Sequence, residues 1–181
     1  MNTLLETQLK RAKVAARLLK NMPTCTKNQA LDKIADALIA HSEEILEANK
    51  KDMAHAKEVN MTKAMQDRLL FTHERIVGVS DGVKKVATLP DPVGEVMESW
   101  TRPNGLEISK VRVPIGVFGI IYEARPNVTV DIASLCLKSG NACVLRGGKE
   151  AIHTNKKLVE IMKCATKYIL PEGAIELIMP L

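Results

Sequence analysis

Two short polar clusters in this sequence could do chemistry, and each follows an apolar run. The sharper one is Arg146-Gly147-Gly148-Lys149, which comes after the apolar residues 142–145 and before a helical pattern. Glycines let backbone N–H groups point at an anion, and a helix N-terminus adds partial positive charge. Arg146 and Lys149 place two cations at the same turn. The pattern predicts a phosphate contact, and a contact to an extra ribose phosphate would favour NADP over NAD.

This turn is too small to be a whole binding site. The GxxxxGK[ST] spacing of a P-loop is absent from it. A helix terminus contributes about 0.3–1 kcal/mol to binding an anion, whereas micromolar affinity needs about 8 kcal/mol. We therefore expect an adenine slot and further strands to complete the site.

The other cluster is Tyr122, Glu123, Arg125 and Asn127, which follows the run of residues 116–121 and precedes a second helical pattern. The GxGxxG fingerprint of dinucleotide-binding folds is missing, but ligands of parallel sheets still gather at the carboxyl ends of strands. The Asn127 amide could stabilise a developing oxyanion. It could equally cap the following helix together with Pro126, and spacing alone favours the cap.

The elements around these clusters predict an α/β fold. Residues 111–150 read as a strand–helix–strand unit of a parallel sheet, and a last strand is expected at 174–179. Asn104-Gly105 lies between two alternating runs and predicts a β-hairpin. Trp100 lies on this hairpin, where it would serve as a packing or interface anchor. The apolar periodicity of the first 88 residues predicts only helices, at 3–20, 24–46, 49–59, 62–70 and 73–88.

Composition narrows the class of protein further. Apolar residues make up 46% of the 181 residues and charged residues 26%, as in globular proteins. Aromatics are only 3% and the net charge of +5 is scattered, which argues against a nucleic-acid partner. The histidines and cysteines have no metal-ligand spacing, and no apolar run is long enough for a membrane span. We expect a cytoplasmic protein in which Cys136, Cys143 and Cys164 are reduced and buried.

Longer stretches of the sequence resemble one known family. The segments YEARPNVT, at 122–129, and LRGGKEA, at 145–151, are similar to those of the gamma-glutamyl phosphate reductases, within the aldehyde dehydrogenase superfamily. The resemblance extends to about residue 178. It implies reduction of L-glutamyl 5-phosphate by NADPH, in which a cysteine thiolate displaces phosphate and hydride then reduces the thioester. The product would be L-glutamate 5-semialdehyde, an intermediate of proline biosynthesis.

The resemblance also implies roles for the two polar clusters. Residues 122–125, including Tyr122, Glu123 and Arg125, would line the nicotinamide side, and Asn127 would assist the oxyanion of the thioester. Residues 146–149 would hold the adenine ribose and its phosphate. Family members often have serine in place of Lys149 and Ala124, so neither side chain is expected to be essential.

The expected architecture is a Rossmann-like cofactor domain that is incomplete. We predict N-terminal helices over 1–88, an oligomerising β-hairpin over 89–113 and the first part of an NADP-binding domain over 114–181. The family's nucleophilic cysteine lies in a second α/β domain, which this chain lacks, so we expect an inactive N-terminal fragment of a homo-oligomeric enzyme. Two alternatives are a non-catalytic fragment that binds nucleotide or pairs with another subunit, and an NAD-dependent aldehyde dehydrogenase.

Overall fold

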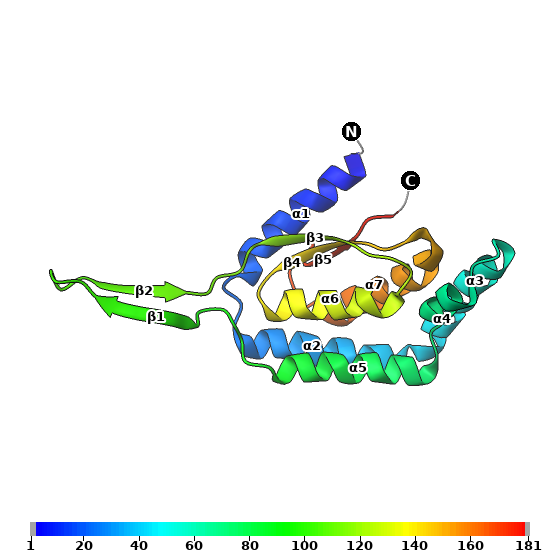
Figure 1. Ribbon diagram of the computed structural model, residues 1–181, viewed down its shortest axis with the longest axis horizontal. Coiled ribbons are helices and arrows are strands. Elements are labelled where there is room, and N and C mark those ends of the chain that lie inside the picture. The colour runs from blue at the N-terminus through cyan, green and yellow to red at the C-terminus, as the bar shows by residue number, and fades with distance from the viewer. Residues whose placement is uncertain (1–2, 180–181) are drawn as a thin grey trace.

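The computed structural model describes residues 3–179 and has a three-stranded parallel sheet at its centre (Figure 1). Its strands are β3 (Val117–Ile121), β4 (Ala142–Arg146) and β5 (Ile175–Leu177), hydrogen-bonded in that order. Helix α6 (Pro126–Lys138) connects β3 to β4. A short 3-10 turn, η1 (Lys149–Ala151), and helix α7 (Ile152–Thr166) connect β4 to β5. The predicted α/β fold is therefore confirmed.

Helices cover both faces of this sheet. Helix α1 (Thr3–Leu19) contacts all three strands on one face, while α6 and α7 pack on the other (Figure 1). Ala12, Ala15, Ala16 and Leu19 of α1 are buried, whereas Leu9 is 45% exposed. The first helix of the chain therefore covers the face of the sheet that α6 and α7 leave open.

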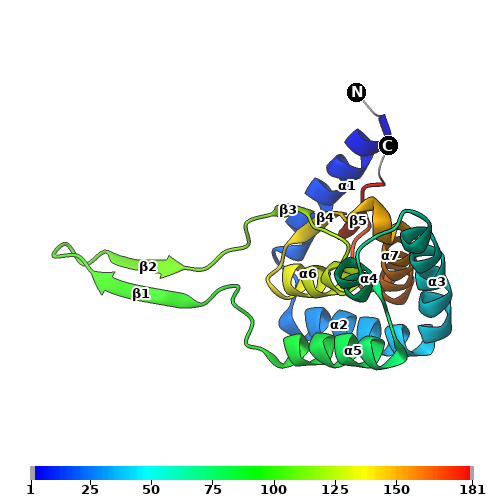
Figure 2. The same ribbon diagram turned by 45° about the vertical axis from the view of Figure 1, so that its right-hand side comes forward.

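A second helical layer packs on α6 and α7. It consists of α2 (Thr24–Ala40) and α5 (His73–Thr88), which lie side by side in both ribbon views (Figures 1 and 2). Helices α3 (Ser42–Glu58) and α4 (Lys63–Leu69) lie at the end of the molecule where β3 and β4 end. The single helix expected over 24–46 is in fact two, because α2 ends at Ala40, His41 lies between the helices and α3 begins at Ser42.

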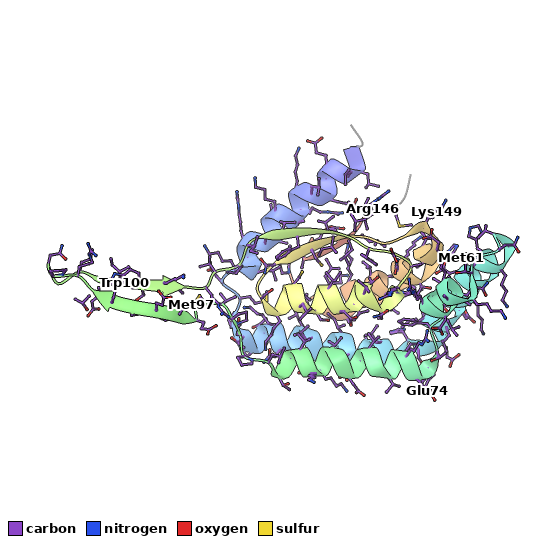
Figure 3. The ribbon with its side chains drawn as sticks, in the orientation of Figure 1. Met61, Glu74, Met97, Trp100, Arg146 and Lys149 are labelled. Carbon is purple, nitrogen blue, oxygen red and sulfur yellow. The ribbon has the colours of Figure 1, made fainter. Side chains whose placement is uncertain are left out.

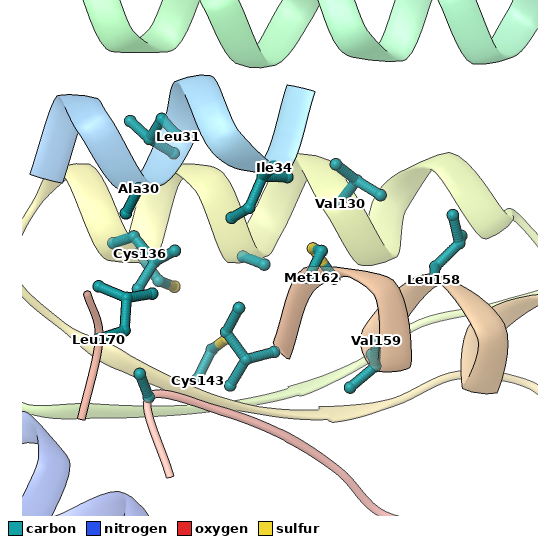
Figure 4. Close-up of a cluster of buried hydrophobic side chains, with 14 of the residues drawn as sticks. Ala30, Leu31, Ile34, Val130, Cys136, Cys143, Leu158, Val159, Met162 and Leu170 are labelled. Atoms are coloured by element: carbon teal, nitrogen blue, oxygen red, sulfur yellow. The ribbon is translucent and has the colours of Figure 1, made fainter. Parts of the chain in front are cut away.

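The core consists mainly of aliphatic side chains. Side chains of α2, α6, α7 and the sheet meet in one cluster, which includes Ile34, Leu158 and Met162 (Figure 4). Cys136 and Cys143 lie within this cluster and are buried, but Cys164 is exposed near the end of α7. The expectation of a buried Cys164 was therefore wrong: an apolar helical context does not say which side of the helix a residue occupies.

The predicted hairpin is present and projects away from the rest of the molecule in both views (Figures 1 and 2). Strand β1 (Val96–Thr101) pairs antiparallel with β2 (Glu107–Val111), and Trp100 faces Ile108. The connection is longer than the two-residue turn typical of Asn-Gly. Only Gly105 has positive φ, at 84°, and the Arg102 nitrogen bonds to the Leu106 oxygen.

Candidate functional site

The two polar clusters of the sequence are neighbours in the structure. Parallel pairing matches Ile121 of β3 with Arg146 of β4, and the backbone nitrogen of Tyr122 donates to the Arg146 oxygen at 3.1 Å. Both strands therefore end at the same edge of the sheet. The two turns that follow, at 122–125 and 147–148, lie side by side there, as expected for a ligand site of a parallel sheet.

The glycines of the second turn are needed because the turns are packed closely. A Cβ atom on Gly147 would collide with the side-chain nitrogen of Asn155 and would lie 3.1 Å from Cε2 of Tyr122. A Cβ on Gly148 would lie 3.4 Å from the backbone of Glu123 and Ala124 and would meet the Glu150 carboxylate. The backbone here forms a narrow cradle that a side chain would fill.

Two exposed cations flank this cradle. The side chains of Arg146 and Lys149 make no hydrogen bond or ion pair within residues 3–179. Figure 3 shows both side chains at the turn that follows β4, at the opposite end of the molecule from the hairpin. The residues present therefore fit an anionic group such as a phosphate, since backbone and charge both favour it.

The first turn of α7 is not available to that anion, contrary to the sequence-based interpretation. The Asp52 carboxylate of α3 accepts hydrogen bonds from the backbone nitrogens of His153 at 3.1 Å and Thr154 at 2.8 Å. The 3-10 turn η1 also separates Gly148 from the start of α7. Because the helix end is already capped by a carboxylate, an anion at this turn must rely on the cradle, Arg146 and Lys149.

Tyr122 is held by a chain of hydroxyl and amide groups. Its hydroxyl lies 2.7 Å from Oγ1 of Thr129, and Thr129 donates to Oδ1 of Asn155 at 2.8 Å. Thr129 has only one hydroxyl hydrogen, so Tyr122 must be the donor in the first bond. Burial raises the pKa of Tyr122, against the opposing effect of the Thr129 hydrogen bond. Tyr122 is therefore a fixed, neutral wall of the site.

Glu123 and Arg125 are both exposed on the first turn. The Glu123 carboxylate lies 3.9 Å from Nη1 of Arg68, which is a weak contact between solvated groups. The Arg125 guanidinium has no hydrogen bond or ion pair within the described part of the chain. Both side chains are thus free to meet a ligand.

Asn127 does not cap the helix that it starts. Arg125 occupies the N-cap position of α6 without a side-chain bond, Pro126 is the first helical residue, and Asn127 is already inside the helix. Its Nδ2 donates to Oδ2 of Asp131 at 3.0 Å. The capping alternative is therefore wrong. An amide nitrogen carries two hydrogens, and the second remains available to an oxyanion.

Sequence reasoning missed four residues that shape this edge of the sheet. They are Asp52, Thr129, Asp131 and Asn155. Only Asp131 had a local signal, since it lies four residues after Asn127 on the same helix face. Among residues 3–179 there is no group of three or more possible metal ligands, and no helix is long and apolar enough to span a membrane.

Comparisons with known proteins identify relatives of this chain. The chain is 55% identical over 168 residues to a gamma-glutamyl phosphate reductase of Clostridium novyi, an alignment that covers 92% of this chain and 40% of the relative. It is 54% identical over 181 residues to that of Moorella thermoacetica, covering 98% and 43%. The chain thus spans about two fifths of the length of these relatives.

Solved structures show the same fold. The crystal structure of gamma-glutamyl phosphate reductase from Thermotoga maritima matches with a TM-score of 0.93 and 44% identity, over 96% of this chain and 42% of that one. The Saccharomyces cerevisiae enzyme matches with a TM-score of 0.90 and 36% identity, over 95% and 45%. The model of the aldehyde dehydrogenase family matches residues 3–180. The chain therefore belongs to the aldehyde dehydrogenase family.

Proposed function

We propose that this chain forms the cofactor side of an NADPH-dependent reductase that converts L-glutamyl 5-phosphate to L-glutamate 5-semialdehyde and phosphate, a step of proline biosynthesis. Relatives of this chain carry the name of that enzyme. The structural observation that carries the proposal is the pairing of Ile121 with Arg146. Because of it, a glycine cradle with two free cations lies beside the turn that bears Tyr122, Arg125 and Asn127.

Some of these residues bind the cofactor, and others act on the reacting group. Arg146 and Lys149 bind the ribose phosphate that distinguishes NADPH from NADH, and the close packing at Gly147 keeps their turn in place. The bound nicotinamide supplies the hydride. Tyr122, held by its bond to Thr129, would line the nicotinamide side of the site. Asn127 donates its free amide hydrogen to the oxygen of the acyl group, whose negative charge grows during the reaction.

The reaction also needs a nucleophilic thiolate, and none of the four cysteines supplies it. Cys136 and Cys143 are buried in the core, and the hydrogen bond that the Cys143 thiol donates to Cys136, together with burial, raises the pKa of Cys143 well above its usual value. Cys25 and Cys164 are exposed, in the first turn of α2 and near the end of α7. We therefore expect the 181-residue chain alone to show no turnover. Reduction of glutamyl phosphate above the background rate would contradict this.

Cofactor choice is tested by thermal unfolding with NADPH and with NADH. A ligand at 100 times its dissociation constant adds about 2.7 kcal/mol to the free energy of unfolding. We expect NADPH to raise the melting temperature by several degrees and NADH to raise it less. Equal shifts, or a larger one with NADH, would overturn the assignment of NADPH. No shift with either would overturn cofactor binding by this chain.

Variants that remove a charge test whether Arg146 and Lys149 cause the preference for NADPH over NADH. Arg146→Gln and Lys149→Gln should each reduce the shift caused by NADPH and leave that caused by NADH nearly unchanged. Lys33→Gln is the matched control, because Lys33 is an exposed lysine of α2 without a partner in the described structure. It removes the same charge far from the turn and should leave both shifts unchanged.

The hairpin is proposed to join copies of this chain. It projects away from the rest of the described chain, and it exposes Val96, Met97 and Trp100 by 44–56% of their surface (Figure 3). An isolated two-stranded ribbon is marginally stable in water. Association with a second copy would bury these side chains and stabilise the ribbon.

A further inference from the structure

A cavity of about 470 Å³ lies beside Asn127, on the side of α6 that faces α4 and α5. Helix α4 and the N-terminal ends of α5 and α6 lie together in both ribbon views (Figures 1 and 2). The residues of its lining that matter below are Arg68, Arg75, Gly78, Arg125, Asn127 and Asp131. The cavity is open to solvent and carries charges of both signs.

Some of these charges are already paired within the protein. The Arg75 guanidinium donates to the Asp67 carboxylate at 2.9 Å and to the Leu70 carbonyl oxygen at 2.7 Å. These two charged side chains therefore hold the α4–α5 connection and offer little to a ligand. Their pairing leaves the other three charged groups to define what the cavity can bind.

The remaining groups are one carboxylate and two guanidiniums. Asp131 accepts a single hydrogen bond, from Asn127, so its carboxylate can accept others. Arg125 has no partner in residues 3–179, and Arg68 has only the 3.9 Å contact with Glu123. Partial burial raises the pKa of Asp131, and the hydrogen bond from Asn127 opposes this. A carboxylate in such surroundings gains from a nearby cation.

We propose that this cavity binds the α-amino-acid end of the substrate, with Asp131 accepting from the α-ammonium group and Arg125 binding the α-carboxylate. This inference rests on the proposed function. An α-amino acid carries one positive and one negative group on the same carbon, which matches a free carboxylate beside a free guanidinium. Its side-chain acyl group then reaches Asn127, which lies in the same lining.

The assignment explains why a neutral amide and a carboxylate share the first turns of α6. Asp131 is bonded to the amide that meets the acyl oxygen and, in this proposal, also to the ammonium group at the other end of the substrate. A compound without the ammonium group would leave the Asp131 carboxylate beside a ligand carboxylate without compensation. The cavity would therefore discriminate glutamyl from glutaryl compounds.

Binding is tested on the 181-residue chain by following its backbone amide NMR signals during titration with L-glutamate. We expect saturable shifts at Gly78, Asn127 and Asp131. Glutarate, which lacks the ammonium group, and 4-aminobutanoate, which lacks the α-carboxylate, should each bind at least about tenfold more weakly, the loss expected for one charge-assisted hydrogen bond. No shifts at these residues up to the solubility limit of L-glutamate would overturn the proposal.

Variants of Asp131 and Arg125 test which group of the ligand each side chain binds. Asp131→Asn should weaken the binding of L-glutamate at least about tenfold and leave the binding of glutarate unchanged, because only L-glutamate has the ammonium group. Arg125→Gln should weaken the binding of L-glutamate and leave the binding of 4-aminobutanoate unchanged. Equal weakening of both ligands by either variant would show a general structural effect and contradict the assignment. Shifts of the same signals with inorganic phosphate but not with L-glutamate would make the cavity an anion site instead.

Gly78 provides a steric test that removes no charge. A Cβ atom at this exposed position of α5 would meet nothing within 4 Å. Gly78→Leu should therefore fold and fill part of the cavity, abolishing the shifts caused by L-glutamate. Gly78→Ala is the control and should keep them. Normal binding by Gly78→Leu would contradict the location of the site.

The test is independent of the cofactor experiment. Stabilisation by NADPH depends on Arg146 and Lys149, and binding of L-glutamate depends on Arg125 and Asp131. Loss of the L-glutamate signal with stabilisation by NADPH intact overturns only the amino-acid pocket. The opposite result overturns only the cofactor assignment.

Discussion

The Oδ2 atom of Asp52, in α3, lies 2.8 Å from the backbone nitrogen of Thr154, in the first turn of α7. The same oxygen accepts the Thr154 hydroxyl at 2.6 Å, and both side chains are fully buried. A helix that has no capping side chain of its own is thus capped from a residue 102 positions earlier. This bond fixes the start of α7, and with it the Gly147-Gly148 turn that precedes it.

Replacing Asp52 should therefore destabilise the protein. Asp52→Ala leaves two backbone N–H groups and the hydroxyl hydrogen of Thr154 without acceptors, so we expect a loss of about 1–3 kcal/mol in the free energy of unfolding. Urea unfolding followed by circular dichroism measures it. Glu47→Ala is the control, an exposed acid of the same helix whose removal should cost less than about 0.5 kcal/mol. Equal midpoints for the two variants would show that the cap contributes nothing.

Gly147 and Asn155 should be energetically coupled. Because a Cβ on Gly147 collides with the Asn155 side chain, Gly147→Ala should displace that side chain from Thr129. Asn155→Ala removes the obstacle, so the double variant should be more stable than the sum of the two losses predicts, by about 0.5–3 kcal/mol. A double-mutant cycle by urea unfolding measures this difference.

Gly148→Ala is the matched control for that cycle. The atom closest to its added methyl group would be the tip of the Glu150 side chain, which can rotate away, and the backbone contacts stay at 3.4 Å. We expect a smaller loss than for Gly147→Ala and no coupling to Asn155→Ala. If Gly147→Ala and Gly148→Ala reduce the free energy of unfolding equally, the collision with Asn155 is not the reason that position 147 needs a glycine.

Local patterns in the sequence were enough to predict the sheet edge. Parallel strands that alternate with helices must end at the same edge, so Tyr122 and Arg146 could be expected to be neighbours. The hairpin followed from two alternating runs around Asn104-Gly105. These features depend on residues close in sequence, whose spacing is visible without a structure.

Features that depend on distant contacts could not be predicted in this way. Nothing near Asp52 indicates that it caps α7, since its two partners lie about a hundred residues later. The same holds for Asn155, whose role comes from packing against Gly147 and Thr129. The cap that spacing favoured for Asn127 is absent for a different reason: whether an asparagine is the N-cap or lies inside the helix depends on where the first helical turn begins.

The buried ion pair between Lys27 and Asp91 should make stability depend on pH. The Lys27 nitrogen lies 2.8 Å from the Asp91 carboxylate, and the two side chains are 1% and 10% exposed. Burial alone would raise the pKa of Asp91, but hydrogen bonds from Lys27, the Val93 nitrogen and Thr24 outweigh it and hold the pKa below its usual value. A lowered pKa stabilises the folded state above the pKa of the unfolded chain, about 3.9.

We expect this stabilisation to be lost as the pH falls through the lowered pKa of folded Asp91. Asp91→Ala leaves Lys27 buried without its partner and should cost about 3–5 kcal/mol at pH 7. The difference from the unmodified protein should shrink in acid, where Asp91 is protonated. Urea unfolding at pH 7 and below pH 4 measures both effects.

The exposed ion pair between Asp36 and Lys84 gives a control for Asp91. Its atoms lie 3.4 Å apart and both side chains are more than half exposed, so Asp36→Ala should cost at most about 1 kcal/mol. If Asp91→Ala reduces the free energy of unfolding by the same amount at both pH values, the negative charge of Asp91 does not contribute to stability.

The exposed tryptophan of the hairpin should control association between copies of the chain. Trp100 is 44% exposed on a ribbon that projects away from the rest of the described chain, so Trp100→Ser should leave the unfolding midpoint nearly unchanged. It should shift the mass measured by sedimentation velocity toward the monomer, because aromatic side chains contribute most to interfaces. Tyr168→Ser is the control, since Tyr168 is 93% exposed but lies after α7, away from the hairpin. If both variants sediment alike, the hairpin does not join subunits.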